Sequence, residues 1–73
     1  KGFNKMSVRD AWHRLMGPAI SKYTKTVELN NDILYITLES APLREELSYG
    51  KEKIVNLLNE EMGKTLIRKI VLR

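Results

Sequence analysis

The side chains that most often carry out catalysis are few in this sequence of 73 residues, and they are poorly placed for it. His13 is the single histidine, and there is no cysteine to act as a nucleophile or a thiolate ligand. Acidic residues are adjacent at 45–46 and 60–61, but neighbours on a helix point about 100° apart and do not converge on one substrate atom. The four glycines are isolated and form no phosphate-binding loop. We therefore predict that the protein is not an enzyme and needs neither a metal nor a cofactor.

Basic residues are concentrated at the two ends of the chain, although the formal net charge is +4. Residues 1–25 carry six basic groups and one acid, and residues 64–73 carry four basic groups and no acid. Between them, residues 26–63 carry three basic groups and eight acids. Two ends that meet in the fold would form a positive face suited to a polyanion, whereas separated ends would only keep the surface solvated. In the first case the nucleic-acid-binding residues are expected to be Arg14, Lys22, Lys25, Arg68 and Lys69.

The first helix that must position these groups is predicted to begin after Ser7, whose hydroxyl can cap the free amides of the first turn. Trp12 lies at the centre of an apolar stripe with helical spacing and is expected to be buried. Gly17-Pro18 should interrupt this helix, because proline lacks the amide donor and crowds the preceding turn.

Strands and further helices are predicted for the rest of the chain. Two extended runs meet at a tight hairpin turn at Asn30-Asn31, and in the second of them, Ile33 to Glu39, alternate residues should face the core. Ser40 and Pro42 are typical of a helix start, and the helix that follows is either continuous to Gly63 or broken at Tyr49-Gly50. The run from Thr65 to Leu72 is rich in β-branched residues and predicts a last strand.

These elements predict an α+β fold in the order α-β-β-α(α)-β, with a three-stranded sheet covered by helices on one face. Residues 1–73 should form a single domain, with residues 1–6 as a flexible lead-in. The lack of cysteine favours a cytoplasmic location, and no apolar run reaches the roughly 20 residues of a membrane span.

The sheet face away from the helices is expected to be partly apolar, with Ile33, Tyr35, Ile67 and Val71 on it. Such a patch would bind a protein partner or a second copy of the chain. The alternative is that the stems of basic side chains shield these residues from water. Tyr35 and Val71 are the predicted interface residues here.

A helix break at Tyr49-Gly50 would give the element order of prokaryotic-type KH domains. A KH domain clamps a nucleic-acid backbone with a GXXG loop at that break. Here the loop reads Tyr49-Gly50-Lys51-Glu52, so the fold is predicted to be KH-like without the standard clamp. RNA binding by a KH relative is one alternative function.

Several ordered motifs across residues 9–73 resemble the DciA-like family. Trp12 is followed five residues later by Gly17, as in the family's first helix. The segment 29–36 resembles the family's strand hairpin, and 40–47 resembles its next helix start. Asn59, Gly63 and the closing segment 67–72 complete the pattern.

The resemblance implies a KH-like, non-catalytic adaptor that binds the replicative DNA helicase and DNA, the latter through phosphates, and assists helicase loading. Leu43 stands where the family often has tryptophan, so it is a predicted partner contact that keeps an apolar anchor without the ring. The alternative is a protein-only interaction or dimerisation domain, and a homodimer is compatible with either function.

Overall fold

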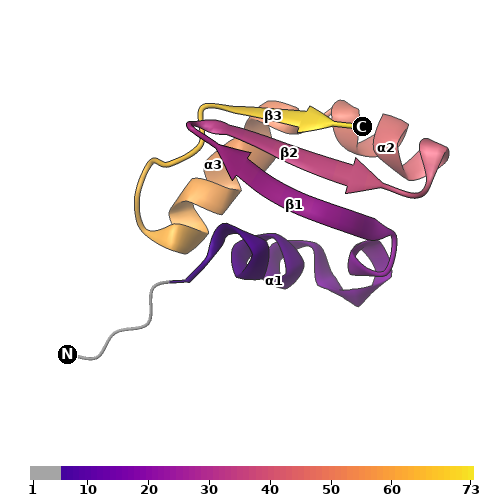
Figure 1. The fold of residues 1–73 in the computed structure, drawn as a ribbon, viewed down its shortest axis with the longest axis horizontal. Coiled ribbons are helices and arrows are strands. Elements are labelled where there is room, and N and C mark those ends of the chain that lie inside the picture. The colour runs from indigo at the N-terminus through magenta and orange to yellow at the C-terminus, as the bar shows by residue number, and fades with distance from the viewer. Residues whose placement is uncertain (1–5) are drawn as a thin grey trace.

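The computed structural model describes residues 6–73, which form three helices and a three-stranded sheet (Figure 1). The predicted α+β class and the order α-β-β-α-α-β are confirmed, and the second helix is broken at Tyr49-Gly50. The predicted flexible lead-in lies outside the described residues except for Met6, which packs partly buried against the core. The elements are α1 (Val8–Ser21), β1 (Thr24–Asn30), β2 (Ile33–Leu38), α2 (Ala41–Ser48), α3 (Lys51–Met62) and β3 (Lys69–Leu72).

The sheet has the order β1-β2-β3, with β2 antiparallel to β1 and parallel to β3. A two-residue turn of Asn31 and Asp32 joins β1 to β2, one residue later than the sequence predicts. Asn31 has φ 59°, a left-handed conformation that asparagine tolerates in hairpin turns. The parallel strand β3 is reached through α2, which lies beyond the end of β2, and α3, which crosses behind the sheet in Figure 1.

The predicted alternation along β2 is confirmed, because Leu34, Ile36 and Leu38 are buried while the residues between them are half-buried. The buried side chains face the helices, and Trp12 of α1 is completely buried among them. The indole N–H of Trp12 donates to the hydroxyl of Thr24 (3.0 Å), which itself donates to the carbonyl of Ile20 (3.1 Å). This chain of hydrogen bonds satisfies the one polar atom of the indole and ties α1 to β1.

The helix α1 is kinked at Gly17, as the Gly17-Pro18 pair predicts. Gly17 has φ 81° and ψ 174°, a conformation that is essentially restricted to glycine. His13 and Ser21 lie on the two sides of the kink, and Nδ1 of the histidine is 2.7 Å from the serine hydroxyl. His13 therefore has a structural hydrogen-bond partner within its own helix.

The last strand begins at Lys69, four residues later than the predicted start at Thr65. Just before the strand, the backbone of Leu66 and Ile67 forms hydrogen bonds with the side chain of Asn59. Its Oδ1 accepts the backbone N–H groups of Leu66 and Ile67, and its Nδ2 donates to the carbonyl of Ile67, all at 2.9 Å. These bonds hold the loop between α3 and β3 against α3, just before the chain enters the sheet as its edge strand.

Candidate nucleic-acid interface and partner surfaces

The five predicted nucleic-acid-binding residues do not come together in one site. Lys22 and Lys25 lie where β1 begins, beside the end of β2 at Leu38. Lys69 lies opposite Ile33, at the other end of β2. The five-residue separation along β2 corresponds to about 17 Å at ~3.3 Å per residue. The structure therefore contains two basic groups at opposite ends of the sheet instead of one continuous face.

Two of the five residues are engaged with acidic partners. Nε of Arg14 is 3.1 Å from a carboxylate oxygen of Glu61, and Nε of Arg68 is 2.9 Å from Asp32. The hydrogen bond from Arg68 lowers the pKa of the Asp32 carboxyl below its usual value, so this acid stays ionised beside the arginine. Both arginines therefore have part of their charge neutralised within the fold.

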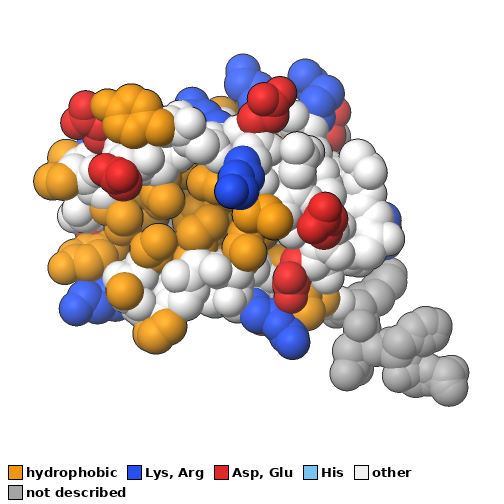
Figure 2. Space-filling view, turned by 180° about the vertical axis from the view of Figure 1, so that it is seen from behind, with side chains coloured by type: hydrophobic (Ala, Val, Ile, Leu, Met, Phe, Trp, Pro, Cys, Tyr) orange, Lys and Arg blue, Asp and Glu red, His pale blue; other side chains and the backbone are white. Residues whose placement is uncertain are grey.

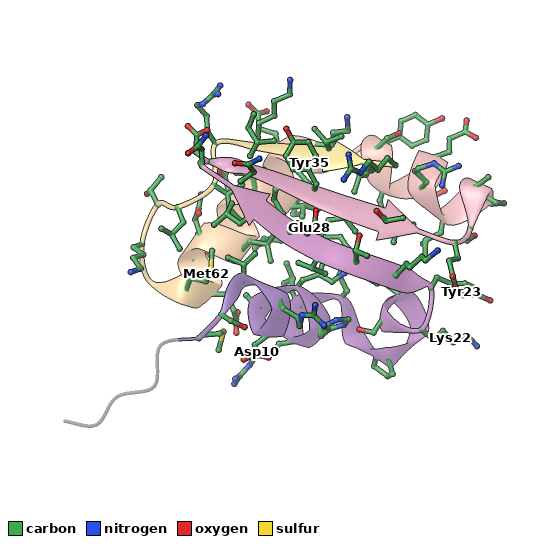
Figure 3. All side chains as sticks on the ribbon, viewed as in Figure 1. Asp10, Lys22, Tyr23, Glu28, Tyr35 and Met62 are labelled. Carbon is green, nitrogen blue, oxygen red and sulfur yellow. The ribbon has the colours of Figure 1, made fainter. Side chains whose placement is uncertain are left out.

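Lys22 and Lys25 flank an exposed aromatic ring. Tyr23 keeps 40% of its surface exposed, and the ammonium of Lys22 lies 5.4 Å from the centre of its ring. Figure 3 shows Lys22 and Tyr23 together at one end of the molecule, where α1 turns into β1. Neither lysine forms an ion pair with an acid of the described segment 6–73. This corner combines two lysines that are not paired with acids and a partly exposed aromatic ring, over which Lys22 itself lies.

A hollow of about 400 Å³ lies at the other end of the sheet, between α3, the α3–β3 loop and β3. Its basic lining comes from Lys51, Arg68 and Lys69, with Glu52 as the acidic member. Lys51 was not among the predicted binding residues. The helix break at Tyr49-Gly50 could have identified it, because the break makes Lys51 the first residue of α3.

The predicted partner contacts Tyr35 and Val71 are neighbours on the sheet face away from the helices, across β2 and β3. The guanidinium of Arg73 lies 4.9 Å from the centre of the Tyr35 ring, and its Nη2 is 3.9 Å from Glu28. Figure 3 shows Tyr35 and Glu28 side by side on this face. The guanidinium of Arg73 therefore lies over the Tyr35 ring. Ile67, which was expected on this face, is instead buried in the core.

Leu43 lies on the opposite side of the molecule, half-buried against the core, so it cannot share an interface with Tyr35. The side of the molecule that carries Leu43 also exposes apolar surface. Figure 2 shows hydrophobic side chains gathered there between α2 and the end of α1. Leu43 and Leu47 contribute from α2 and Ile20 from α1, each partly exposed. Tyr49, which ends α2, is 76% exposed and was missing from the predicted contacts.

Metal-binding clusters and membrane-spanning helices are both absent from residues 6–73. In that range no three or more His, Cys, Asp or Glu residues are grouped so that they could hold a metal ion. No helix in the same range has both the length and the apolar character needed to cross a membrane.

Comparison with known proteins gives one match. The model of the family described as "Dna[CI] antecedent, DciA" matches residues 1–72. No curated protein and no solved structure matches the chain. Since the family match covers all but the last residue, the chain belongs to the DciA family, a helicase-loader-type family with a role in DNA replication.

Proposed function

We propose that this protein is a non-catalytic, single-domain adaptor that binds the replicative helicase and single-stranded DNA at two different surfaces. The match to the DciA family carries the proposal, because it extends over residues 1–72 and so involves the fold described above. The Tyr23 corner and α2 are neighbours at one end of that fold, since the backbone N–H of Glu39, next to the Ser40 cap of α2, donates to the carbonyl of Tyr23 (2.8 Å). Two adjoining surfaces would let one small domain contact both partners.

DNA binding is assigned to Lys22, Tyr23 and Lys25. Two unpaired lysines can contact phosphates, and an exposed tyrosine can stack on a base. A duplex offers no free base face for such stacking, so the combination favours a single strand. Arg14 and Arg68 are weaker candidates, because Glu61 and Asp32 already offset their charge.

Salt-dependent binding of a labelled oligothymidylate, followed by fluorescence anisotropy, tests this assignment. Each phosphate contact on a single strand contributes about 0.7 to the slope of log K against log salt. Lys22→Ala with Lys25→Ala should therefore lower the slope by about 1.4. The matched double variant Arg68→Ala with Lys69→Ala removes the same charge at the other end of the sheet and should leave the slope unchanged. No binding by the wild type at low salt would refute the DNA assignment.

Helicase binding is assigned to the apolar surface of α2, formed by Leu43, Leu47 and Tyr49. Leu43 and Leu47 are one helical turn apart and share a face. Tyr49 follows the last turn of the helix, is 76% exposed, and donates its hydroxyl to the carboxylate of Glu45 (3.1 Å). Exposed tyrosines are frequent energetic centres of protein interfaces. The opposite sheet face is a poorer candidate, because Arg73 covers Tyr35 there.

A pull-down of the replicative helicase tests the second assignment. Tyr49→Asp should reduce the recovered helicase at least tenfold, because it places a charge in an apolar contact. Tyr35→Ala, on the opposite sheet face, should leave recovery unchanged. If Tyr49→Asp recovered as much helicase as wild type while Tyr35→Ala recovered less, the helicase interface would be on the sheet face that carries Tyr35 and not on α2.

A further inference from the structure

The outer edge of β3 has backbone groups without a strand partner. The N–H of Arg73 donates to Ile36 (2.9 Å) and its carbonyl accepts from Leu38 (2.8 Å), so both groups point toward β2. Because these directions alternate along a strand, the N–H and C=O groups of Ile70 and Leu72 point away from the sheet. Among the described residues, no strand lies on that side of β3. Unpaired groups on an edge strand can pair with another extended chain. Ile70 is only 2% exposed and Leu72 is partly exposed, so this row is accessible mainly at Leu72.

The hollow described above adjoins the start of this edge, where Lys69 and Ile70 line it. Lys69 faces the side of the sheet away from the helices and Ile70 faces the core, so a cavity lined by both residues is at the strand's edge. The first turns of α3 form the other wall, with Lys51 and Val55. A groove between an edge strand and a helix is the arrangement by which PDZ domains receive an added strand.

The charge on β3 excludes some partners for this edge. Basic residues precede, begin and follow the strand at positions 68, 69 and 73, and residues 64–73 contain no acid. Antiparallel pairing of β3 with a second copy would bring these like charges opposite one another, which is destabilising. An acidic strand would instead place carboxylates beside Lys69 and Lys51.

We propose that the edge of β3 and the adjoining hollow bind an extended acidic segment of a partner protein, which adds to the sheet as a further strand. A peptide can satisfy both the N–H and the C=O groups of Ile70 and Leu72. The phosphodiester backbone supplies acceptors alone, so it would leave those carbonyls unpaired. This inference is independent of the proposed helicase and DNA surfaces, which use α2 and the Tyr23 corner.

A fluorescein-labelled eight-residue peptide of alternating valine and glutamate is the probe, titrated into the full chain at low salt. We expect saturable binding that slows hydrogen exchange at the amides of Ile70 and Leu72, which point away from β2, and most clearly at Leu72, the more exposed of the two residues. The amides of Val71 and Arg73, which point toward β2, should be protected with and without peptide. The same peptide with its alternate backbone nitrogens methylated should not bind, because it cannot form the strand hydrogen bonds.

Charge variants distinguish peptide binding at the hollow from peptide binding elsewhere on α3. Lys51→Glu with Lys69→Glu should weaken the acidic peptide about tenfold, since each exposed ion pair contributes a factor of about two to five and is replaced by repulsion. Lys53→Glu changes an exposed lysine of the same helix outside the hollow and should leave peptide affinity nearly unchanged.

Three results would overturn the proposal. One is the absence of peptide binding at low salt, and another is binding that leaves exchange at Ile70 and Leu72 unchanged. The third is protection of these two amides by oligothymidylate or by self-association, with the peptide failing to protect them. Circular dichroism of each variant, matched to wild type, ensures that a lost interaction is not a lost fold.

Discussion

Replacing Asn59 with alanine should be among the most destabilising changes that remove no apolar side chain. The amide of Asn59 makes three hydrogen bonds of 2.9 Å to the backbone of Leu66 and Ile67, in a partly buried setting. Each such bond contributes about 0.5–1.5 kcal/mol net, so the loss should total roughly 2–4 kcal/mol. A chain of this length typically has a free energy of unfolding of about 4–11 kcal/mol, so this loss is a large fraction of the total stability.

Urea denaturation, followed by the fluorescence of the buried Trp12, measures this loss. Asn56→Ala is the matched control, because it makes the same change on the exposed side of α3 and should shift stability by no more than about 0.5 kcal/mol. Asn59→Asp keeps the oxygen that accepts the N–H groups of Leu66 and Ile67 but loses the donor to the Ile67 carbonyl, so it should fall between wild type and Asn59→Ala. A loss in Asn59→Ala no larger than in Asn56→Ala would refute the structural role given to this side chain.

Three smaller perturbations test other parts of the fold. Gly17→Ala should cost about 1–3 kcal/mol in thermal or urea denaturation, because the φ of 81° strains any residue with a β-carbon; a neutral effect would contradict the kink. Thr24→Val should cost about 1 kcal/mol by removing the acceptor of the Trp12 indole, and an unchanged urea midpoint would argue against that bond. The lowered pKa of Asp32 means that its pairing with Arg68 stabilises the fold fully above the ordinary carboxyl pKa of about 3.9, and that this stabilisation is lost as pH falls from there through the lowered pKa. The stability difference between wild type and Asp32→Asn should therefore be larger at pH 6 than at pH 3, and a difference independent of pH would refute this pairing.

Local sequence signals predicted most of the fold because each depends on residues close in the chain. The alternation at 34, 36 and 38 identified the core face of β2, and Gly17-Pro18 identified the kink in α1. The start of β3 was predicted four residues early, since Leu66 and Ile67 have strand-forming side chains. Their backbone pairs with Asn59 of α3, a contact that no local pattern reveals.

The candidate sites were less predictable, because they depend on which segments meet. The sequence placed basic residues near both ends, but the strand register sends Lys25 and Lys69 to opposite ends of the sheet. Ion pairs such as that of Arg68 with Asp32 join residues far apart in the chain. The hollow beside β3 depends likewise on the packing of α3 against the strand.

The central claim is that one small domain brings the replicative helicase to single-stranded DNA. The most direct test is to measure the fraction of helicase retained on a closed single-stranded DNA circle, with and without the protein. We predict that the protein raises this fraction, and that Tyr49→Asp and the Lys22→Ala with Lys25→Ala variant each abolish the increase while remaining folded. An unchanged fraction in the presence of wild-type protein would contradict the account.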